Sequence, residues 1–261
     1  MSKLINIGQC ALCNTQKELV NSHFIPKHTY RKMRDRVKPG YAVMLIDGEG
    51  NNSTSNQITQ RLLCNDCEQL LRENGEDFYS KNGYWSDGQP PRILESIVKD
   101  LQKQNVIKSG LLSTESERKL EYFVSSIFWR GTFSWPKYKP ITVPENITEE
   151  MRSFLLELTL PRSYKIIVIP IYRENYSVSF PFGWPSSNGD MQYFFCIESL
   201  GYMLMSSDVF KWHYPTLDSE LSVIFYTRDD AFIDSYFTMF ECNYNRSEKR
   251  GGKPHDISWL K

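Results

Sequence analysis

Two cysteine pairs of the form Cys-x-x-Cys constrain this chain more than any other feature of its sequence. Cys10 and Cys13 form the first pair, and Cys64 and Cys67 form the second. Two such pairs supply four thiolates in two short turns, which is a ligand set that tetrahedral zinc prefers. The alternative interpretation is four cysteines that bind no ion. Because the surrounding segment has few long apolar runs, we expect bound zinc to contribute directly to its folding.

Composition indicates a folded protein with no overall preference for a polyanionic partner. The chain has 261 residues, of which 40% are hydrophobic and 24% are charged, and its 31 basic residues equal its 31 acidic ones. A local basic patch can still bind nucleic acid within a neutral chain. No apolar run has the length of a signal peptide or of a membrane-spanning helix. We therefore expect a cytoplasmic protein with reduced cysteines and no membrane partner.

The sequence divides into two expected units of an α+β protein. Residues 1–85 form the zinc-bound unit, residues 92–261 form an α+β domain with a mainly antiparallel sheet, and the segment Asn82–Pro91 separates them. Asp47–Gln57, between the cysteine pairs, has the composition of a loop or hairpin tip. In the second unit, helices are expected from Ser113 to Gly131 and from Thr148 to Pro161. Strands are expected at Tyr164–Tyr172, Tyr176–Phe180, Gln192–Ser199, Gly201–Ser206 and Glu220–Tyr226.

Two short segments add a family resemblance to the cysteine pairs. Between the pairs stands Ser22-His23-Phe24-Ile25-Pro26-Lys27, and the second pair belongs to Leu62-Leu63-Cys64-Asn65-Asp66-Cys67-Glu68. Together these SHxIPK and LLCxxCE segments resemble the HNH, or ββα-metal, endonuclease family over about the first quarter of the chain. The resemblance implies that residues 1–85 form a zinc-bound treble-clef or ββα-metal module. It also implies metal-dependent hydrolysis of phosphodiester bonds.

The same resemblance suggests which residues act. By position His23 is the general base that takes a proton from the attacking water, and Glu68 is a ligand for catalytic Mg²⁺ or Mn²⁺. Asn56 is the residue expected to orient the base, with Gln60 as the alternative. Ser22 departs from the family, which commonly has an aspartate or histidine metal ligand there. His23 also has a structural interpretation, as a hydrogen-bonded histidine beside the zinc ion.

A basic strip follows His23. Six positive charges between Lys27 and Lys38 face a single negative charge at Asp35. Such a strip can replace the counterions of a phosphate backbone, or it can be a solvated helix face. His28, within the strip, is a surface residue, a phosphate contact or a helper ligand. The residues expected to bind nucleic acid are Lys27, His28, Arg31, Lys32, Arg34 and Arg36.

These features predict a metal-dependent endonuclease that acts on DNA in preference to RNA, and the resemblance suggests a role in bacterial or phage defence. The alternative is a non-catalytic zinc-dependent protein that binds nucleic acid or another protein and retains a decayed nuclease site. Residues 92–261 contain no nucleophile motif, phosphate-binding loop or second metal motif. Whether they form a homo-oligomer or bind a partner protein is left open.

Overall fold

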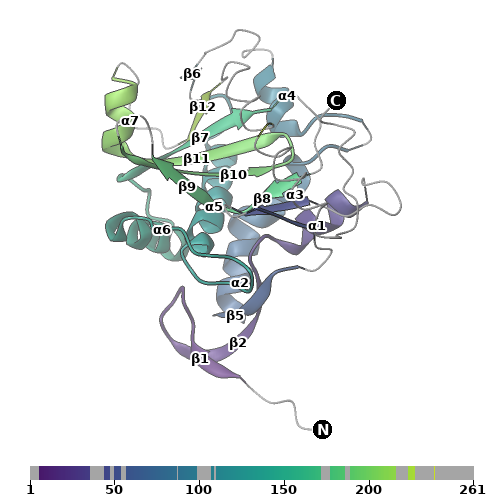
Figure 1. Cartoon of the computed structure of the whole chain (residues 1–261), viewed down its shortest axis with the longest axis vertical. Coiled ribbons are helices and arrows are strands. Elements are labelled where there is room, and N and C mark those ends of the chain that lie inside the picture. Colours follow the sequence, from purple (N-terminus) through teal and green to yellow (C-terminus); the bar gives the residue numbers. More distant parts are fainter. Residues whose placement is uncertain are drawn as a thin grey trace.

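The computed structural model describes residues 6–35, 44–47, 50–53, 57–86, 88–98, 107–108, 110–171, 177–185, 189–215, 223–226 and 238. Within these ranges the protein is a mixed α+β structure with one small and one large sheet (Figure 1). The α+β class expected from the sequence is therefore confirmed. Asn56 and Arg36 lie outside the described residues.

The small sheet carries both cysteine pairs. It contains β1 (Ile7–Gln9), β2 (Gln16–His23) and β5 (Thr59–Cys64), in the order β1-β2-β5 with antiparallel pairing throughout. Helix α1 (Lys27–Arg34) follows β2. After β5 the chain runs without a break through α2 (Asn65–Leu71), the π-helical segment η1 (Arg72–Glu76) and α3 (Asp77–Asn82). The chain is thus helical from Asn65 to Asn82.

The large sheet has the strand order β4-β3-β8-β10-β11-β7-β12-β6, with β9 paired to β10. Its strands are β3 (Met44–Asp47), β4 (Gly50–Ser53), β6 (Ile107–Lys108), β7 (Tyr164–Pro170), β8 (Ser177–Ser179), β9 (Phe182–Pro185), β10 (Met191–Ile197), β11 (Leu200–Ser206) and β12 (Val223–Tyr226). Each of the five expected strands has a counterpart here, and most pairs are antiparallel. Two pairs are parallel, β12 with β7 and β3 with β8.

Both expected helices of the second half are present, but the second is shifted at both boundaries and ends four residues before Pro161. Helix α5 (Thr114–Gly131) begins as expected, and the Ser113 hydroxyl accepts a hydrogen bond from the Ser116 backbone N–H. Helix α6 (Glu145–Glu157) begins three residues before Thr148, because Pro144 holds the backbone geometry that precedes a helix. Two short helices, α4 (Arg92–Val98) and α7 (Ser207–His213), complete the set.

Residues from both expected units pack in one hydrophobic core. The Phe24 ring stacks at 5.0 Å on Trp135 and at 5.0 Å on Phe180. Further along, the Tyr79 ring stacks on Phe123 with 3.9 Å between centroids. The division into 1–85 and 92–261 stays a prediction, and the aromatic contacts join side chains from either side of it.

The expected linker between the units is itself hydrogen-bonded to the large sheet. Within it, the Trp85 indole N–H donates to the Ser199 hydroxyl at 2.6 Å, and its backbone N–H donates to the Glu198 carboxylate at 3.3 Å. Both acceptors lie in the turn between β10 and β11. The segment therefore contributes contacts to the large sheet as well as connecting two parts of the chain.

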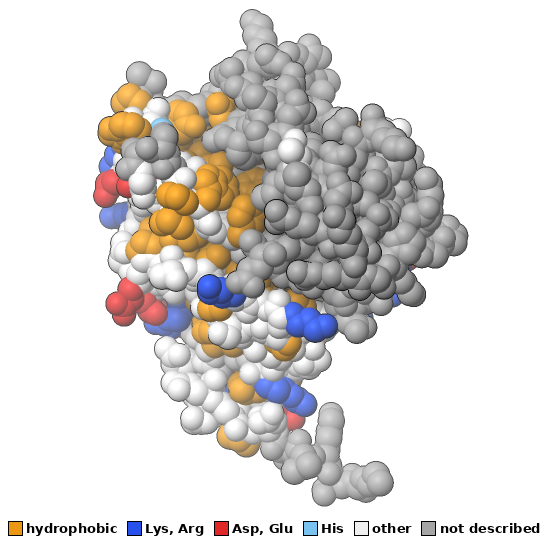
Figure 2. All heavy atoms as spheres, viewed as in Figure 1, with side chains coloured by type: hydrophobic (Ala, Val, Ile, Leu, Met, Phe, Trp, Pro, Cys, Tyr) orange, Lys and Arg blue, Asp and Glu red, His pale blue; other side chains and the backbone are white. Residues whose placement is uncertain are grey.

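Two surface properties complete the description. None of the helices in the described ranges combines the length and the apolar character that crossing a bilayer requires. On the face shown in Figure 2, hydrophobic side chains gather over α7 and β9. Two large apolar residues are exposed in these elements and the neighbouring β10, Trp212 at 65% and Met191 at 45%. The cysteine cluster lies elsewhere, between the small sheet and α2.

Candidate metal centre

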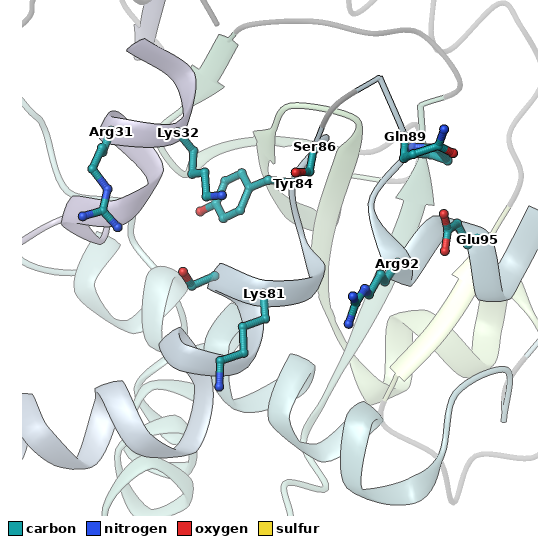
Figure 3. Close-up of a pocket in the computed structure, with 10 residues that line it drawn as sticks. Arg31, Lys32, Lys81, Tyr84, Ser86, Gln89, Arg92 and Glu95 are labelled. Carbon is teal, nitrogen blue, oxygen red and sulfur yellow. The ribbon is translucent and has the colours of Figure 1, made fainter. Parts of the chain in front are cut away.

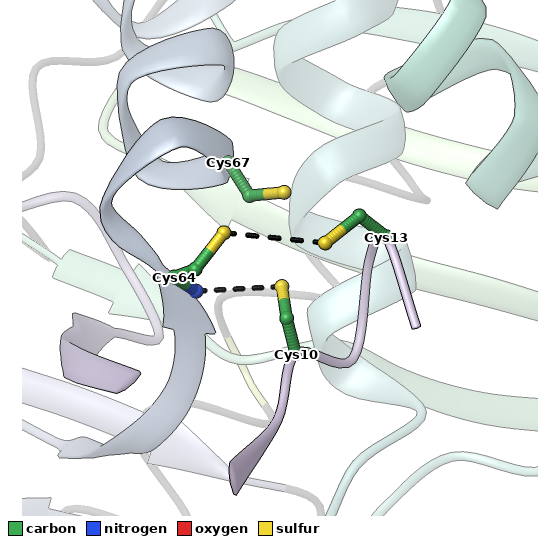
Figure 4. A group of neighbouring side chains, drawn as sticks. All are labelled: Cys10, Cys13, Cys64 and Cys67. Atoms are coloured by element: carbon green, nitrogen blue, oxygen red, sulfur yellow. Dashed lines mark hydrogen bonds between the residues drawn. The ribbon is translucent and has the colours of Figure 1, made fainter. Parts of the chain in front are cut away.

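The two cysteine pairs meet at one place in the structure. Cys10 and Cys13 lie in the turn between β1 and β2, Cys64 is the last residue of β5, and Cys67 is in the first turn of α2. The four Sγ atoms all lie within 4.8 Å of one another (Figure 4). Fifty residues, 14 to 63, separate the pairs in the sequence. The expected four-sulfur arrangement is therefore present.

Backbone hydrogen bonds shape the turn of the first pair. The Asn14 N–H donates to the Cys10 carbonyl at 2.8 Å, and the Cys10 N–H donates to the Thr15 carbonyl at 3.0 Å. Asn14 has a φ of 57°, in the left-handed region that asparagine tolerates better than most residues. The turn is held to β5 because the Cys64 N–H donates to the Cys10 sulfur at 3.3 Å. Each pair therefore points its thiols at the other.

The sulfur spacing fits a tetrahedral metal ion. A Zn–S bond of about 2.3 Å places the sulfurs of a tetrahedral site about 3.8 Å apart. The Sγ atoms of Cys13 and Cys64 are 4.0 Å apart, whereas a disulfide requires about 2.05 Å. All four cysteines are free. The cluster could therefore hold a metal ion such as zinc.

Without a bound cation, ionisation of one thiol disfavours ionisation of its neighbours. Burial raises the pKa of Cys67, and the neighbouring Cys64 and Cys10 raise it further. Burial also acts to raise the pKa of Cys13, but hydrogen bonds from the Thr15 hydroxyl and backbone lower it to about 6. One thiolate is thus favoured while further ionisation is resisted. A bound cation removes that resistance, since it compensates the charge of every coordinating sulfur.

His23 and its predecessor have different surroundings at the end of β2. Ser22 is fully buried, and its hydroxyl accepts a hydrogen bond from the Leu63 backbone N–H at 3.1 Å. His23 is half-buried and stands opposite Thr59 in the β2–β5 ladder. The Ser22 hydroxyl therefore joins two strands, while the His23 side chain retains access to solvent.

Glu68 lies in α2, next to Cys67. Its Oε1 atom is buried and has no hydrogen-bond partner. No hydrogen bond or ion pair joins the described side chains of His23 and Glu68. Cys64 pairs with Leu19, and His23 pairs with Thr59, so His23 stands about 13 Å along β2 from the strand position where α2 begins. Within the described part of the chain, no contact brings the two expected catalytic side chains together.

The basic strip forms the outer side of α1. Lys27, Arg31 and Arg34 are exposed, and Lys32 is half-buried. His28 differs, because burial lowers its pKa to about 4 and its Nε2 atom is buried without a partner. A neutral imidazole at pH 7 supplies no positive charge to a phosphate. The cationic part of the described strip is therefore made by the lysines and arginines alone.

A basic pocket lies beside this helix (Figure 3). Its volume is about 780 Å³. It is lined by Arg31, Lys32, Ser80, Lys81, Tyr84, Ser86, Gln89, Pro90, Arg92 and Glu95. Sequence reasoning identified the first two of these cations but missed Lys81 and Arg92, because nothing in the spacing of 81 and 92 indicates that α3 and α4 approach α1.

Sequence reasoning also missed a buried ion pair between Arg130 and Glu76. The Arg130 side chain is 1% exposed, and its guanidinium donates to the Glu76 carboxylate at 2.7 Å. The pair joins η1 to α5. Arginine is seldom fully buried unless it is paired, but the sequence offers no indication of which acidic residue it meets.

Comparison with protein-family models, with curated proteins and with solved structures finds no match to this chain.

Proposed function

We propose that this protein is a zinc-stabilised, metal-dependent endonuclease with HNH-like chemistry, acting on DNA in preference to RNA. The observation that carries the proposal is the convergence of four cysteine sulfurs at the junction of β5 and α2. A zinc ion held there would fix the pairing of β5 with β2, the strand that ends at His23. Cations follow His23 directly on α1.

The chemistry assigned to His23 is general-base catalysis. Its imidazole takes a proton from water while the water oxygen attacks phosphorus, and the bond from phosphorus to the leaving oxygen breaks. The buried, unpartnered Oε1 of Glu68 fits a cation ligand, because a carboxylate oxygen without a donor needs a positive partner. Mg²⁺ or Mn²⁺ bound by Glu68 would stabilise negative charge on the phosphate. Zinc in the cysteine cluster has the structural role.

A second candidate function is binding to nucleic acid without cleavage. The Ser22 hydroxyl favours it, because the position that commonly holds a metal in the resembled family is here buried and bonded to Leu63. The lack of any hydrogen bond or ion pair between the described side chains of His23 and Glu68 favours it too. In this alternative the zinc cluster and the basic residues keep their roles, and no catalytic ion is held.

Cleavage assays distinguish the two functions. Plasmid, single-stranded DNA and RNA are each incubated with the full chain in Mg²⁺ and then in Mn²⁺. We expect His23→Ala to lower cleavage by about 10²- to 10⁴-fold, the usual contribution of a general base. His213→Ala, in α7, is the matched control and should cleave as the parent does. Equal cleavage by His23→Ala and the parent contradicts the assignment of His23, and a parent that cleaves nothing supports binding alone.

A further inference from the structure

The basic pocket beside α1 has the charge of an anion site. Among the described residues, four cations line it, Arg31 and Lys32 from α1, Lys81 from α3 and Arg92 from α4, against the carboxylate of Glu95. Figure 3 shows the α1 cations on one side of the pocket and Arg92 on the other, with Glu95 on the side remote from α1. The described side chains from these three helices therefore surround one space with an excess of three positive charges.

The walls of the pocket are held in place by buried contacts. The hydroxyls of Tyr84 and Thr29 share a hydrogen bond of 2.5 Å, which joins α1 to the segment after α3. The Tyr84 ring also packs edge-on against Tyr79 at 5.2 Å. On α1, the buried face includes Thr29 and Met33, so Arg31 is left on the outer side. Helix α1 and the segment after α3 are thus held together before any ligand arrives, so the backbone of these walls need not be ordered on binding.

We propose that this pocket binds phosphate groups of a nucleic-acid strand. The inference deepens the proposed function and rests on it for the identity of the polymer. Guanidinium groups match phosphate oxygens in a two-pronged geometry, and the lysines add point charges. The volume of about 780 Å³ lies within the range of about 300–1,000 Å³ typical of ligand pockets.

A strand fits the surface better than a free nucleotide does. Lys27 and Arg34 are exposed on α1 but do not line the pocket. They extend the positive surface past the pocket in both directions along the helix. A free nucleotide ends within the pocket, whereas a polymer carries further phosphates to these outer cations.

Binding measurements test the pocket without any requirement for cleavage. The full chain carrying His23→Ala is titrated, with no added divalent ion, into a fluorescein-labelled single-stranded 12-mer of DNA and then of RNA, and anisotropy gives Kd at several salt concentrations. Arg31→Gln and Lys81→Gln are combined in one variant. Lys211→Gln, on α7 far from the pocket, is the matched control.

The expected change follows from counterion release. Each lost phosphate contact on a single strand removes about 0.7 from the slope of log K against log salt. Two contacts therefore lower the slope by about 1.4 and weaken binding about 25-fold at 0.1 M salt. Lys211→Gln should retain the parent slope. Unchanged circular dichroism and metal content confirm that the variants fold.

Three results would overturn the inference. The first is no binding of either 12-mer by the His23→Ala chain, and the second is an equal slope for the double variant and Lys211→Gln. The third is that ATP binds as tightly as the 12-mers and depends on the same two cations, since the site then serves a free nucleotide. The proposed cleavage can fail independently of the pocket. If the parent cleaves nothing but its strand binding depends on Arg31 and Lys81, the phosphate-binding pocket stands and the nuclease activity is refuted.

Discussion

Replacing Glu76 by glutamine tests how the metal-bearing part of the chain is fastened to α5. Glu76 accepts a hydrogen bond at 2.7 Å from Arg130, whose side chain is 1% exposed. The Nε and Nη1 atoms of Arg130 are buried without partners, so the carboxylate supplies the compensating negative charge. Removing one partner of a buried pair costs about 3–5 kcal/mol, because the other charge stays buried. Since Glu76 is 15% exposed, we expect the lower end, about 3 kcal/mol.

The assay is urea unfolding followed by tryptophan fluorescence at a fixed zinc concentration. Glu73→Gln is the control, because Glu73 lies in the same π-helical segment but is 54% exposed in its ion pair with Arg72, and it should cost less than about 0.5 kcal/mol. A Glu76→Leu, Arg130→Met double variant should recover most of the loss, since it leaves no buried charge. If Glu76→Gln and Glu73→Gln are equally stable, the Glu76 carboxylate does not stabilise the fold by compensating the buried charge of Arg130.

Three further perturbations have defined outcomes. Gly75→Ala places a Cβ atom 2.9 Å from the Phe123 backbone, and urea unfolding should show a loss of about 1–3 kcal/mol; no loss would mean that η1 and α5 separate freely. The pKa of His28 is lowered from 6.5 to about 4. The unfolded chain therefore takes up this proton at a higher pH than the folded chain does. The free energy of unfolding then falls as pH drops from 6.5 towards 4, by up to about 3 kcal/mol. His28→Phe should remove that part of the pH dependence, and identical pH profiles for variant and parent would refute the assignment. Cys67→Ser should lower the zinc content below one ion per chain by elemental analysis, whereas Cys196→Ser, a buried cysteine of β10, should not; full zinc content in Cys67→Ser would place the ion elsewhere.

Local sequence patterns were sufficient for much of the second half of the chain. Ser113 caps α5, and the apolar runs at 164–172 and 192–199 became β7 and β10. These predictions succeed because helix capping and the burial of both faces of a strand are indicated by residues that are adjacent in the sequence. Strand β9 escaped prediction because Gly183 and Pro185 interrupt its four residues, and both residue types are depleted in strands.

The cysteine cluster could also be predicted, because two Cys-x-x-Cys pairs supply the four thiolates that a tetrahedral metal site requires. The pocket could not. Lys81 and Arg92 line the pocket only because α1, α3 and α4 approach one another, and no local sequence pattern indicates that approach. The same holds for Arg130, whose partner Glu76 lies 54 positions away. His28 shows another limit of local patterns, since its charged neighbours do not reveal the burial that lowers its pKa to about 4.

The parallel pairing of β3 with β8 sets the order in which this protein can be assembled during synthesis. Met44 lies opposite Ser177, so β3 leaves the ribosome long before its neighbouring strand has been made. The edge of β3 that pairs with β8 must therefore stay unpaired until the C-terminal half of the chain has been synthesised. Strand pairing between residues so far apart in the sequence slows folding, and the unpaired edge of β3 can meanwhile pair with non-native strands. Early capture of zinc by the four cysteines would join the two ends of the segment that contains β3.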